Sequence, residues 1–330
     1  MNYIESKKVL VTGAGGFIGS HLVERLVRDG AQVRAYLHYN SRNDWGLLEL
    51  LPKEIMANVE VVTGDIQDPF AVDAAVKGCR VVYHLSSLIA IPYSYVAPQH
   101  YVNTNVLGAV NVMQACRNHG VERVVHTSTS ECYGTAQYVP IDEKHPLQGQ
   151  SPYSASKIGA DMIAESYWRS FSLPVAIIRP FNTFGPRQSA RAVIPTIISQ
   201  ALAGQDIRLG SLTPTRDLNF VTDTVDGFVR VANNDAAIGQ VINIGSGREI
   251  SIGDLAQLIL QLTGCPSKIV ADAERVRPGK SEVERLLCNA DKARQLIGWQ
   301  PSHTLEEGLM QTIAWVRENL GRFKTNIYNI

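Results

Sequence analysis

Short apolar runs alternate with helical patterns through the first half of the chain. The runs are almost continuously apolar, which is typical of parallel strands whose two faces are both covered. They predict strands at residues 7–12, 33–37, 59–63, 80–85 and 123–128. Apolar positions at helical spacing predict the intervening helices at residues 17–28, 69–76 and 99–118. This alternation predicts an α/β fold with a doubly wound parallel sheet and right-handed crossovers.

The rhythm changes after about residue 180, where the segments become shorter and prolines interrupt them more often. We therefore expect a large sheet domain over residues 1–180 and a smaller α/β cap domain over residues 181–330. Residues 175–179 and 241–244 still resemble buried strands, so part of 215–250 is expected to return to the large sheet. The last residues, 323–330, are expected to form a strap on the surface.

Composition argues against several classes of partner. The 330 residues carry 31 basic and 31 acidic side chains, so the charge balance indicates neither a nucleic acid nor an anionic membrane. No stretch is long and apolar enough to span a bilayer, and the first residues contain no secretory apolar segment. The five cysteines are scattered without zinc spacing, which favours reduced thiols and a cytoplasmic location.

A glycine-rich turn follows the first predicted strand and opens the first predicted helix. Gly13, Gly16 and Gly19 allow a tight turn and a close approach of the backbone to a pyrophosphate, and Phe17 and Ile18 begin the helix. The free N–H groups and positive dipole end of that helix favour an anion. The pattern indicates a Rossmann-type dinucleotide site. A glycine-rich turn without a ligand is the alternative, although three glycines are a poor choice for stability alone.

The end of the second strand bears on the choice of dinucleotide. An NAD site usually has a carboxylate there to bind the ribose 2′-hydroxyl, but this chain has Leu37 followed by His38. Ser41 and Arg42 come soon after, and the Arg42 guanidinium is suited to a 2′-phosphate, which favours NADP over NAD. A solvated loop residue is the alternative for Arg42.

A tyrosine and a lysine lie four residues apart at the start of a helix that follows the fifth strand and its loop. Ser151 is the expected N-cap and Pro152 the first helical residue, which places Tyr153 and Lys157 on one face. A lysine ammonium near a phenol favours the phenolate, the form that acts as a general base. An ordinary amphipathic helix is the alternative, and the position in the chain favours the catalytic pair.

Further motifs extend over almost the whole chain. They occupy residues 11–19 (VTGAGGFIG), 65 (D), 84 (H), 105–108 (NVLG), 128–129 (ST), 153–157 (YSASK), 179–182 (RPFN), 185–187 (GPR), 216–217 (RD), 243–247 (NIGSG), 277–279 (RPG) and 296–301 (LIGWQP). On these motifs the chain resembles the extended short-chain dehydrogenase/reductases of the NAD-dependent epimerase/dehydratase family. The resemblance implies a Rossmann-type domain, a cap domain that grips a nucleotide diphosphate, and a homodimer.

The resemblance also implies roles for individual residues. Tyr153 is the base, Lys157 activates it and binds the nicotinamide ribose, and Thr129 hydrogen-bonds the sugar 4-hydroxyl. Besides the glycine turn, Tyr153 and Lys157, the expected cofactor contacts are His38, Ser41, Arg42, Asp65, Ile66, Leu85, Ser86, Ser87 and Asn105. The expected substrate contacts in the cap are Asn182, Arg187, Arg191, Arg216 and Arg277. The alternatives are a turn or capping role for Asp65 and a surface ion pair for each arginine.

The segment after the fifth strand, residues 128–134 (STSECYG), distinguishes two activities within the family. There, 4-epimerases have small neutral residues where Ser130 and Glu131 stand, and dehydratases place an acid/base. Ser-Glu resembles the GDP-mannose dehydratases, whereas dTDP-glucose dehydratases have Asp-Glu. A 4,6-dehydratase must take a proton from C5 and protonate the departing 6-hydroxyl. Glu131 is the only carboxylate in the segment, so we assign both tasks to it, although the identity of the acid stays open; a carboxylate capping the next helix is the alternative.

A closer resemblance bears on the substrate. Residues 89–94, 139–146, 149–153 and 185–191 are similar to bacterial N-acetylglucosamine nucleotide 4,6-dehydratases, which implies a UDP- or GDP-linked N-acetylhexosamine. UDP is preferred on family frequency alone. The implied homodimer would form through the helix that carries Tyr153 and its neighbour around residues 105–116, where the apolar positions could equally belong to the core.

Three other functions were open on the sequence. A UDP-hexose 4-epimerase shares the fold and cofactor but has no use for Glu131. A non-catalytic NADP-binding regulator is expected to lack Tyr153 or Lys157, and both are present. A metal hydrolase would use His84 and His126 at strand ends, but no paired His motif lies nearby. Core histidines are the better interpretation, and no metal is expected.

Overall fold

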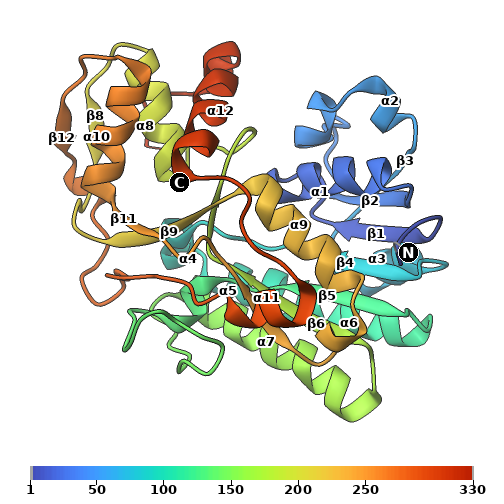
Figure 1. Cartoon of the computed structure of the whole chain (residues 1–330). Coiled ribbons are helices and arrows are strands. Elements are labelled where there is room, and N and C mark those ends of the chain that lie inside the picture. The colour runs from blue at the N-terminus through green and yellow to red at the C-terminus, as the bar shows by residue number, and fades with distance from the viewer. Residues whose placement is uncertain (1–2, 329–330) are drawn as a thin grey trace.

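The computed structural model describes residues 3–328 and has a seven-stranded parallel sheet at its centre (Figure 1). The strand order is β10-β6-β5-β4-β1-β2-β3. The strands are β1 (Lys8–Thr12), β2 (Gln32–His38), β3 (Val59–Gly64), β4 (Val81–His84), β5 (Arg123–Thr127), β6 (Val175–Pro180) and β10 (Val241–Ile244). Every neighbouring pair is parallel, which confirms the doubly wound α/β class.

Helices cover both faces of this sheet, as Figure 1 shows. One face carries α1 (Phe17–Arg28) and α9 (Val221–Ala232), and the other carries α3 (Pro69–Val76), α6 (Gly108–Asn118) and α7 (Pro152–Phe171). Successive strand residues point to opposite faces. Accordingly Val9 and Val11 belong to the core under α1 and α9, while Leu10 belongs to the core under α3, α6 and α7.

The second half of the chain builds a smaller unit beside the sheet. Its helices are α8 (Val193–Leu202), α10 (Ile252–Thr263) and α12 (Leu305–Glu318). A three-stranded sheet has the order β11-β9-β7, and a two-stranded sheet pairs β12 with β8. Their bounds are β7 (Asn182–Phe184), β8 (Ile207–Leu209), β9 (Thr215–Phe220), β11 (Glu249–Ser251) and β12 (Ile269–Ala271). The apolar core under α1 and α9 continues into this unit, so the two pack as neighbours without a solvent gap.

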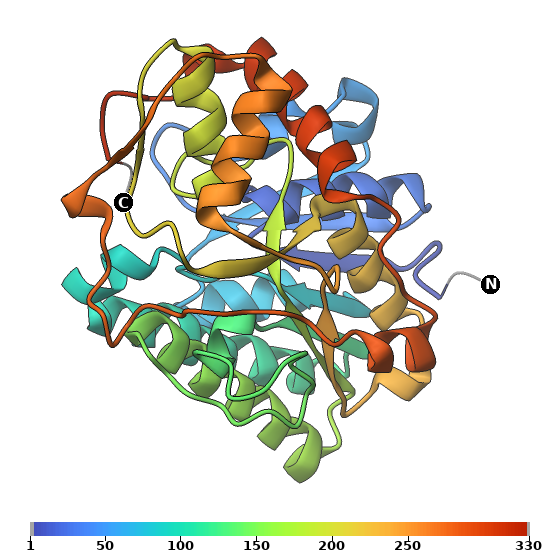
Figure 2. The same cartoon turned by 60° about the vertical axis from the view of Figure 1, so that its left-hand side comes forward.

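Short elements connect these parts. They are η1 (Gly46–Leu50), α2 (Lys53–Met56), α4 (Ile91–Val96), α5 (Pro98–Tyr101), η2 (Val102–Leu107), η3 (Ser130–Tyr133), η4 (Asp235–Ala237), η5 (Ala273–Arg275), α11 (Asp291–Ile297) and η6 (Leu320–Arg322). In Figure 2 the segment between β12 and α11 crosses from the cap to the edge of the large sheet. There α11 contacts β10, so the chain returns to the large domain a second time.

Sequence and structure differ in one helix. The helix predicted at 99–118 is instead α5, the π-helical segment η2 and α6 in succession. A π turn is a local widening that periodicity does not register, and such turns are frequent near functional sites. The predicted division of the chain at residue 180 stays a prediction.

The last described residues contact the cap. Asn326 accepts a hydrogen bond from Gln205 at 2.6 Å, and the Arg275 guanidinium lies 4.6 Å from the ring centroid of Tyr328. Residues 329 and 330 of the predicted strap lie outside the described residues. Within residues 3–328, no helix combines the length and the apolar character needed to cross a bilayer.

Candidate active site

The carboxyl ends of the parallel strands form the edge at which the predicted site residues collect. β1 has β2 on one side and β4 on the other, so the direction of the chain connections reverses there. Ligands of open α/β sheets bind in the crevice at such a switch point. The glycine turn after β1 and the loop after β4 meet at this point, next to the loop after β5.

The glycine turn after β1 is crowded on its inner side. Gly13 has φ +69° and donates its amide hydrogen to the Tyr36 carbonyl at 3.2 Å. A Cβ on Gly13 would lie 2.9 Å from the Leu85 carbonyl carbon and from the Ser86 nitrogen. A Cβ on Gly19 would collide with the Gly13 carbonyl oxygen. The turn therefore requires glycine for its backbone conformation and for its packing against the loop after β4.

The first turn of α1 has the properties of an anion site. Gly16 is its N-cap and supplies no side-chain hydrogen bond, and the turn contains no acidic residue. Its N–H groups and positive dipole end are therefore uncompensated by side chains. A Cβ on the adjacent Gly15 would lie 2.9 Å from the Trp45 carbonyl oxygen, so this part of the turn packs closely against the loop after β2. These residues fit the pyrophosphate of a dinucleotide cofactor.

The loop after β2 exposes the three residues predicted to select the dinucleotide, His38, Ser41 and Arg42. Asn40 holds this loop, because its Oδ1 accepts the amide hydrogens of Arg42 at 3.1 Å and Asp44 at 3.0 Å. Within residues 3–328 the Arg42 side chain has no ion pair or hydrogen bond. Its guanidinium is therefore available to a ligand.

The residues after β3, Asp65 and Ile66, make contacts within the fold. Asp65 Oδ1 accepts the Gln67 amide hydrogen at 2.9 Å, which is the turn role that was the alternative for Asp65. Its carbonyl oxygen accepts the Tyr36 hydroxyl at 2.9 Å. Ile66 is buried, and a Cβ on Gly108 would lie 3.1 Å from its side chain.

The loop after β4 is tied to β1. Thr12 Oγ1 accepts the amide hydrogens of Leu85 and Ser86, both at 3.1 Å, and lies 2.9 Å from His84 Nδ1. His84 thus has a hydrogen-bond partner within the core, as a structural histidine does. The Ser87 Oγ is buried without a hydrogen-bond partner among the described residues. A ligand in this crevice would satisfy it.

Asn105 positions this loop rather than presenting a free group. Its Oδ1 accepts the Leu88 amide hydrogen at 2.8 Å, and its Nδ2 donates to the Leu88 carbonyl at 3.0 Å and to Ser156 Oγ at 2.9 Å. Asn105 lies in the π-helical segment η2. The cofactor contact predicted for Asn105 stays a prediction, and in the structure its side chain joins the loop to α7.

The predicted Tyr and Lys lie at the start of α7, which begins at Pro152 with Ser151 as N-cap. Both side chains are buried, and Lys157 Nζ donates to the Thr127 carbonyl at 2.6 Å. Burial raises the pKa of Tyr153, and a hydrogen bond with Thr129 opposes this rise. Burial also lowers the pKa of Lys157. The structure thus holds Tyr153 as a phenol against Thr129, and a positive charge bound nearby would favour its phenolate.

The loop after β5 brings the remaining catalytic candidates to Tyr153. Thr129 is the N-cap of η3, and its Oγ1 accepts the Glu131 amide hydrogen at 3.3 Å. Ser130 and Glu131 are 2% and 7% exposed. The charge of Glu131 contributes to the raised pKa of Tyr153, so the carboxylate lies within electrostatic reach of the phenol. Burial without an ion-pair partner among the described residues is unusual for a carboxylate that merely caps a helix.

The predicted substrate residues fall into separate places. Arg216 and Arg277 converge on Glu282 Oε1 at 3.1 and 3.3 Å. Arg187 has φ +70° and instead pairs with Glu24 of α1 at 2.6 Å. Arg191 is exposed, and the Asn182 Oδ1 is buried without a partner in the described chain. Two arginines thus form a joint cationic site, and Arg187 lies next to the cofactor helix.

Sequence reasoning missed several residues that complete the site. No sequence motif indicated Glu282, the shared partner of Arg216 and Arg277. Asp161 is fully buried beneath the loop after β5 and pairs with Arg179 at 2.7 Å. A signal for Asp161 existed, because it continues the four-residue spacing of Tyr153 and Lys157 along α7.

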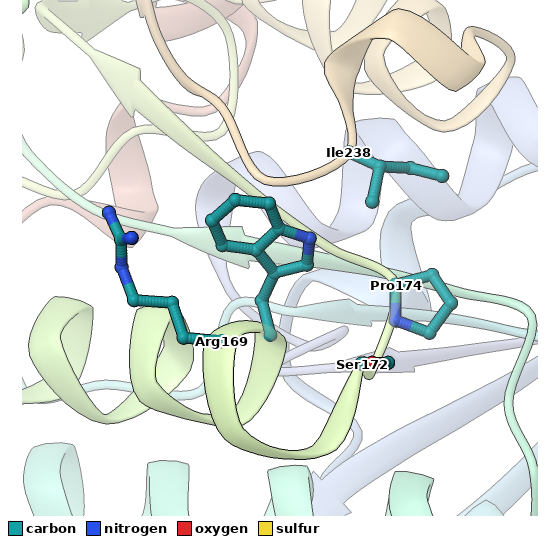
Figure 3. Close-up of a pocket in the computed structure, with 5 residues that line it drawn as sticks. Arg169, Ser172, Pro174 and Ile238 are labelled. Carbon is teal, nitrogen blue, oxygen red and sulfur yellow. The ribbon is translucent and has the colours of Figure 1, made fainter.

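Other features lie away from this edge. A hollow at the far end of α7 is lined by Trp168, Arg169, Ser172, Pro174 and Ile238 (Figure 3). Trp168 lies 15 residues beyond Tyr153 on α7, so roughly 22 Å of helix separates the hollow from Tyr153. In the part of the chain that the structure describes, no group of three His, Cys, Asp or Glu side chains could hold a metal ion.

Known proteins resemble this chain over nearly its full length. The sequence model of a family described as GDP-mannose 4,6 dehydratase matches residues 10–312. A UDP-glucose 4-epimerase of Mycolicibacterium smegmatis is 36% identical, covering 94% of this chain and 98% of its own. A dTDP-glucose 4,6-dehydratase of Streptomyces antibioticus is 33% identical, covering 94% and 92%.

A solved structure shows the same arrangement. DesIV, a dTDP-glucose 4,6-dehydratase of Streptomyces venezuelae solved with NAD and TYD bound, superposes with a TM-score of 0.84 at 29% identity, covering 96% of this chain and 99% of its own. Relatives of both kinds, 4,6-dehydratases and 4-epimerases, thus share the fold and match this chain over nearly its full length at 29–36% identity. The chain belongs to the extended short-chain dehydrogenase/reductases of the NAD-dependent epimerase/dehydratase family, whose members are enzymes of nucleotide-sugar metabolism.

Proposed function

We propose that this protein is a nucleotide-sugar 4,6-dehydratase that converts UDP-N-acetylglucosamine to its 4-keto-6-deoxy product. The observation that carries the proposal is Glu131, which is 7% exposed and lies within electrostatic reach of Tyr153 on the loop that also carries Thr129. A 4-epimerase needs no acid/base at C5 and C6, so a largely buried Glu without an ion-pair partner among the described residues favours the dehydratase. The 36% identity to an epimerase makes that activity the rival for any test to separate.

Each step of the reaction has a residue in this site. Tyr153, as phenolate, takes the proton of the sugar 4-hydroxyl. Thr129 is hydrogen-bonded to the same hydroxyl oxygen. A nicotinamide bound in this crevice would accept the C4 hydride and return it to C6, and its oxidised ring would favour the phenolate of Tyr153. The new C4 ketone acidifies C5, and Glu131 takes that proton and passes it to the departing 6-hydroxyl, which leaves as water. Glu131 then delivers a solvent proton to C5.

The cationic site of Arg216 and Arg277 supports a diphosphate ligand. Two guanidinium groups that share one carboxylate oxygen are close enough to bind neighbouring phosphates in its place. We assign Arg187, Arg191 and Asn182 to contacts with other parts of the same nucleotide-sugar ligand. The choice of N-acetylglucosamine and of UDP over GDP rests on family resemblance.

The cofactor that we propose is NADP, tightly bound and recycled within each turnover. The support is the exposed Arg42 guanidinium after β2 and the absence of a carboxylate at the end of that strand. DesIV was solved with NAD, so the preference requires a direct test. The scattered cysteines support a cytoplasmic location.

We further propose a homodimer through α7 and η2. Ile163 and Tyr167 of α7 pack against the core, whereas Met162 is 45% exposed. Leu107, at the end of the contacting η2, is also 45% exposed. This apolar surface supports an interface between two copies.

The proposed function is tested by replacing Glu131 with Gln, which keeps the shape and removes the carboxylate. With cofactor and UDP-N-acetylglucosamine, Glu131→Gln is expected to oxidise C4 and accumulate reduced nicotinamide, while water loss falls by about 10²- to 10⁴-fold. Tyr153→Phe is the contrast, because it is expected to stop before C4 oxidation. Dehydration at the wild-type rate by Glu131→Gln, measured by product mass, would show that the assignment of Glu131 is wrong.

A further inference from the structure

A buried ion pair lies directly beneath the loop that carries the catalytic candidates. Asp161 of α7 is 0% exposed and Arg179 of β6 is 2% exposed, and Arg179 Nη2 lies 2.7 Å from Asp161 Oδ2. Burial raises the pKa of Asp161, but the charge of Arg179, the nearby His126 ring and a hydrogen bond from Ser128 more than offset it, so the pKa falls below its ordinary value. Moving two charges out of water costs free energy, so we expect this buried ion pair to have a role beyond stability.

The same ion pair fastens the loop at both of its ends. At the first end, Ser128 Oγ donates to Asp161 Oδ2 at 2.5 Å and accepts from Arg179 Nε at 3.1 Å. At the other end, the Tyr133 hydroxyl accepts from Arg179 Nη1 at 2.8 Å and donates to Asn243 Oδ1 at 2.8 Å. The residues between the two fastened ends are 129–132, which include Thr129 and Glu131.

One guanidinium therefore sets the position of the loop relative to the helix of the base. Its three nitrogens have a fixed planar geometry, and each bonds a different partner: Ser128, Tyr133 and Asp161. Asp161 lies on α7 two helical turns beyond Tyr153, on the same stripe of the helix. The loop with Glu131 and the helix with Tyr153 are thus joined through Arg179 and Asp161.

We propose that Arg179 is a positioning residue for the elimination step, acting through Ser128 and Tyr133 to hold Glu131 at C5 and C6 of the sugar. This rests on the proposed dehydratase function. Tyr153 and Lys157 have their own supports, the capped helix α7 and the Thr127 carbonyl. Thr129 directly follows the first anchor, Ser128, whereas Glu131 lies between the two anchors and nearer to Tyr133. Loosening the second anchor, Tyr133, therefore affects elimination more than C4 oxidation.

The most conservative test is Tyr133→Phe. It removes one hydroxyl and leaves the ring in the apolar cluster with Ile141 and Phe181. Tyr167→Phe is the matched control, since it removes a tyrosine hydroxyl that donates to Gln114 at 3.0 Å towards the other end of α7. Arg179→Lys is a second variant. It keeps the positive charge beside Asp161 but removes the planar guanidinium that bonds three different partners.

The experiment follows a single turnover of the full-length protein with its cofactor and UDP-N-acetylglucosamine. Absorbance of reduced nicotinamide reports C4 oxidation, and product mass reports water loss. In Tyr133→Phe and Arg179→Lys we expect elimination to slow relative to oxidation on the order of 10- to 100-fold, because an ångström-scale misplacement has such effects. Reduced nicotinamide then accumulates, and Tyr167→Phe behaves as wild type.

The outcomes separate the inference from the function on which it rests. Equal slowing of both steps, or no change in their ratio in either variant, would overturn the positioning role even where thermal stability falls. A wild-type protein that oxidises C4 and never releases water would overturn the dehydratase function itself. A changed ratio in Tyr167→Phe as well would show that general loosening of α7, not the anchor, controls the step.

Discussion

Arg42 is the residue on which the cofactor preference depends. Its guanidinium has no partner in the described structure, and it follows a strand that ends in His38 instead of a carboxylate. We expect Arg42→Ala to weaken NADP binding by roughly 10- to 100-fold, the value of a charged hydrogen-bonded contact, and to leave NAD binding unchanged. Titration of both dinucleotides by calorimetry measures this. Tighter NAD binding by the wild type, or an equal loss for both, would contradict it.

Single residues also show what can and what cannot be predicted from the sequence. Tyr153, Thr129 and Glu131 were identified because their positions after a strand or at a helix start are local, and the structure brings them together. Asn105 lies in a motif, but its side chain forms hydrogen bonds with Leu88 and Ser156. A motif identifies a position that matters, and only the three-dimensional partners distinguish a ligand contact from a brace.

Helix α1 links the cofactor turn to the cap through His21. Its Nε2 lies 2.9 Å from the Pro186 carbonyl oxygen, and the ring lies near Arg187 and Glu24. Burial, followed by the charge of Arg187, lowers the pKa of His21 to about 4 from its ordinary 6.5. The imidazole is therefore neutral in the folded protein over most of this range.

This shift has a defined effect on stability. Between about pH 6.5 and about pH 4 the unfolded state binds a proton at His21 that the folded state does not, so stability falls as the pH falls. The loss through His21 reaches about 3 kcal/mol at the lower end. We expect His21→Gln to have a shallower pH dependence of the urea unfolding free energy, and His100→Gln, at an exposed site, to keep the wild-type slope. Identical slopes in all three proteins would contradict this.

At the scale of elements, predictions succeeded where the pattern is local. The helices at 17–28 and 69–76 and the strand at 241–244 have the predicted bounds, because apolar spacing and flanking turns determine them. The π-helical η2 was missed, since a single wide turn leaves helical spacing almost unchanged. The Asp161–Arg179 pair joins α7 to β6 across the sheet edge, and no local pattern encodes such a contact.

For the whole molecule, the surface of α7 and η2 predicts assembly. We expect the protein to be a dimer in solution and Met162→Glu combined with Leu107→Glu to shift it to monomer, because charges on this apolar surface oppose its burial. Met310→Glu on α12, also at an exposed methionine, is the control and is expected to stay dimeric. Light scattering after size exclusion gives the mass. A monomeric wild type, or a dimeric double variant, would exclude this interface.

The arrangement of the cap was the part least accessible to sequence. Arg187, Arg216 and Arg277 were assigned together to the nucleotide diphosphate, but the structure pairs Arg187 with Glu24 and the other two with Glu282. Two of these pairs are distant in sequence, with 163 positions between Arg187 and Glu24 and 66 between Arg216 and Glu282. Charge type alone indicates an anion site, whereas the fold decides which cations share it.

The central claim is that Glu131 makes this enzyme a dehydratase, and one measurement tests it most directly. The protein is incubated in heavy water with UDP-N-acetylglucosamine and catalytic NADP⁺ or NAD⁺, and the sugar nucleotide is analysed by mass spectrometry. We expect a product that has lost one water molecule and carries one solvent deuterium at C5. Conversion to the galacto isomer, without water loss or deuterium, would contradict the account and leave Glu131 with a structural role only.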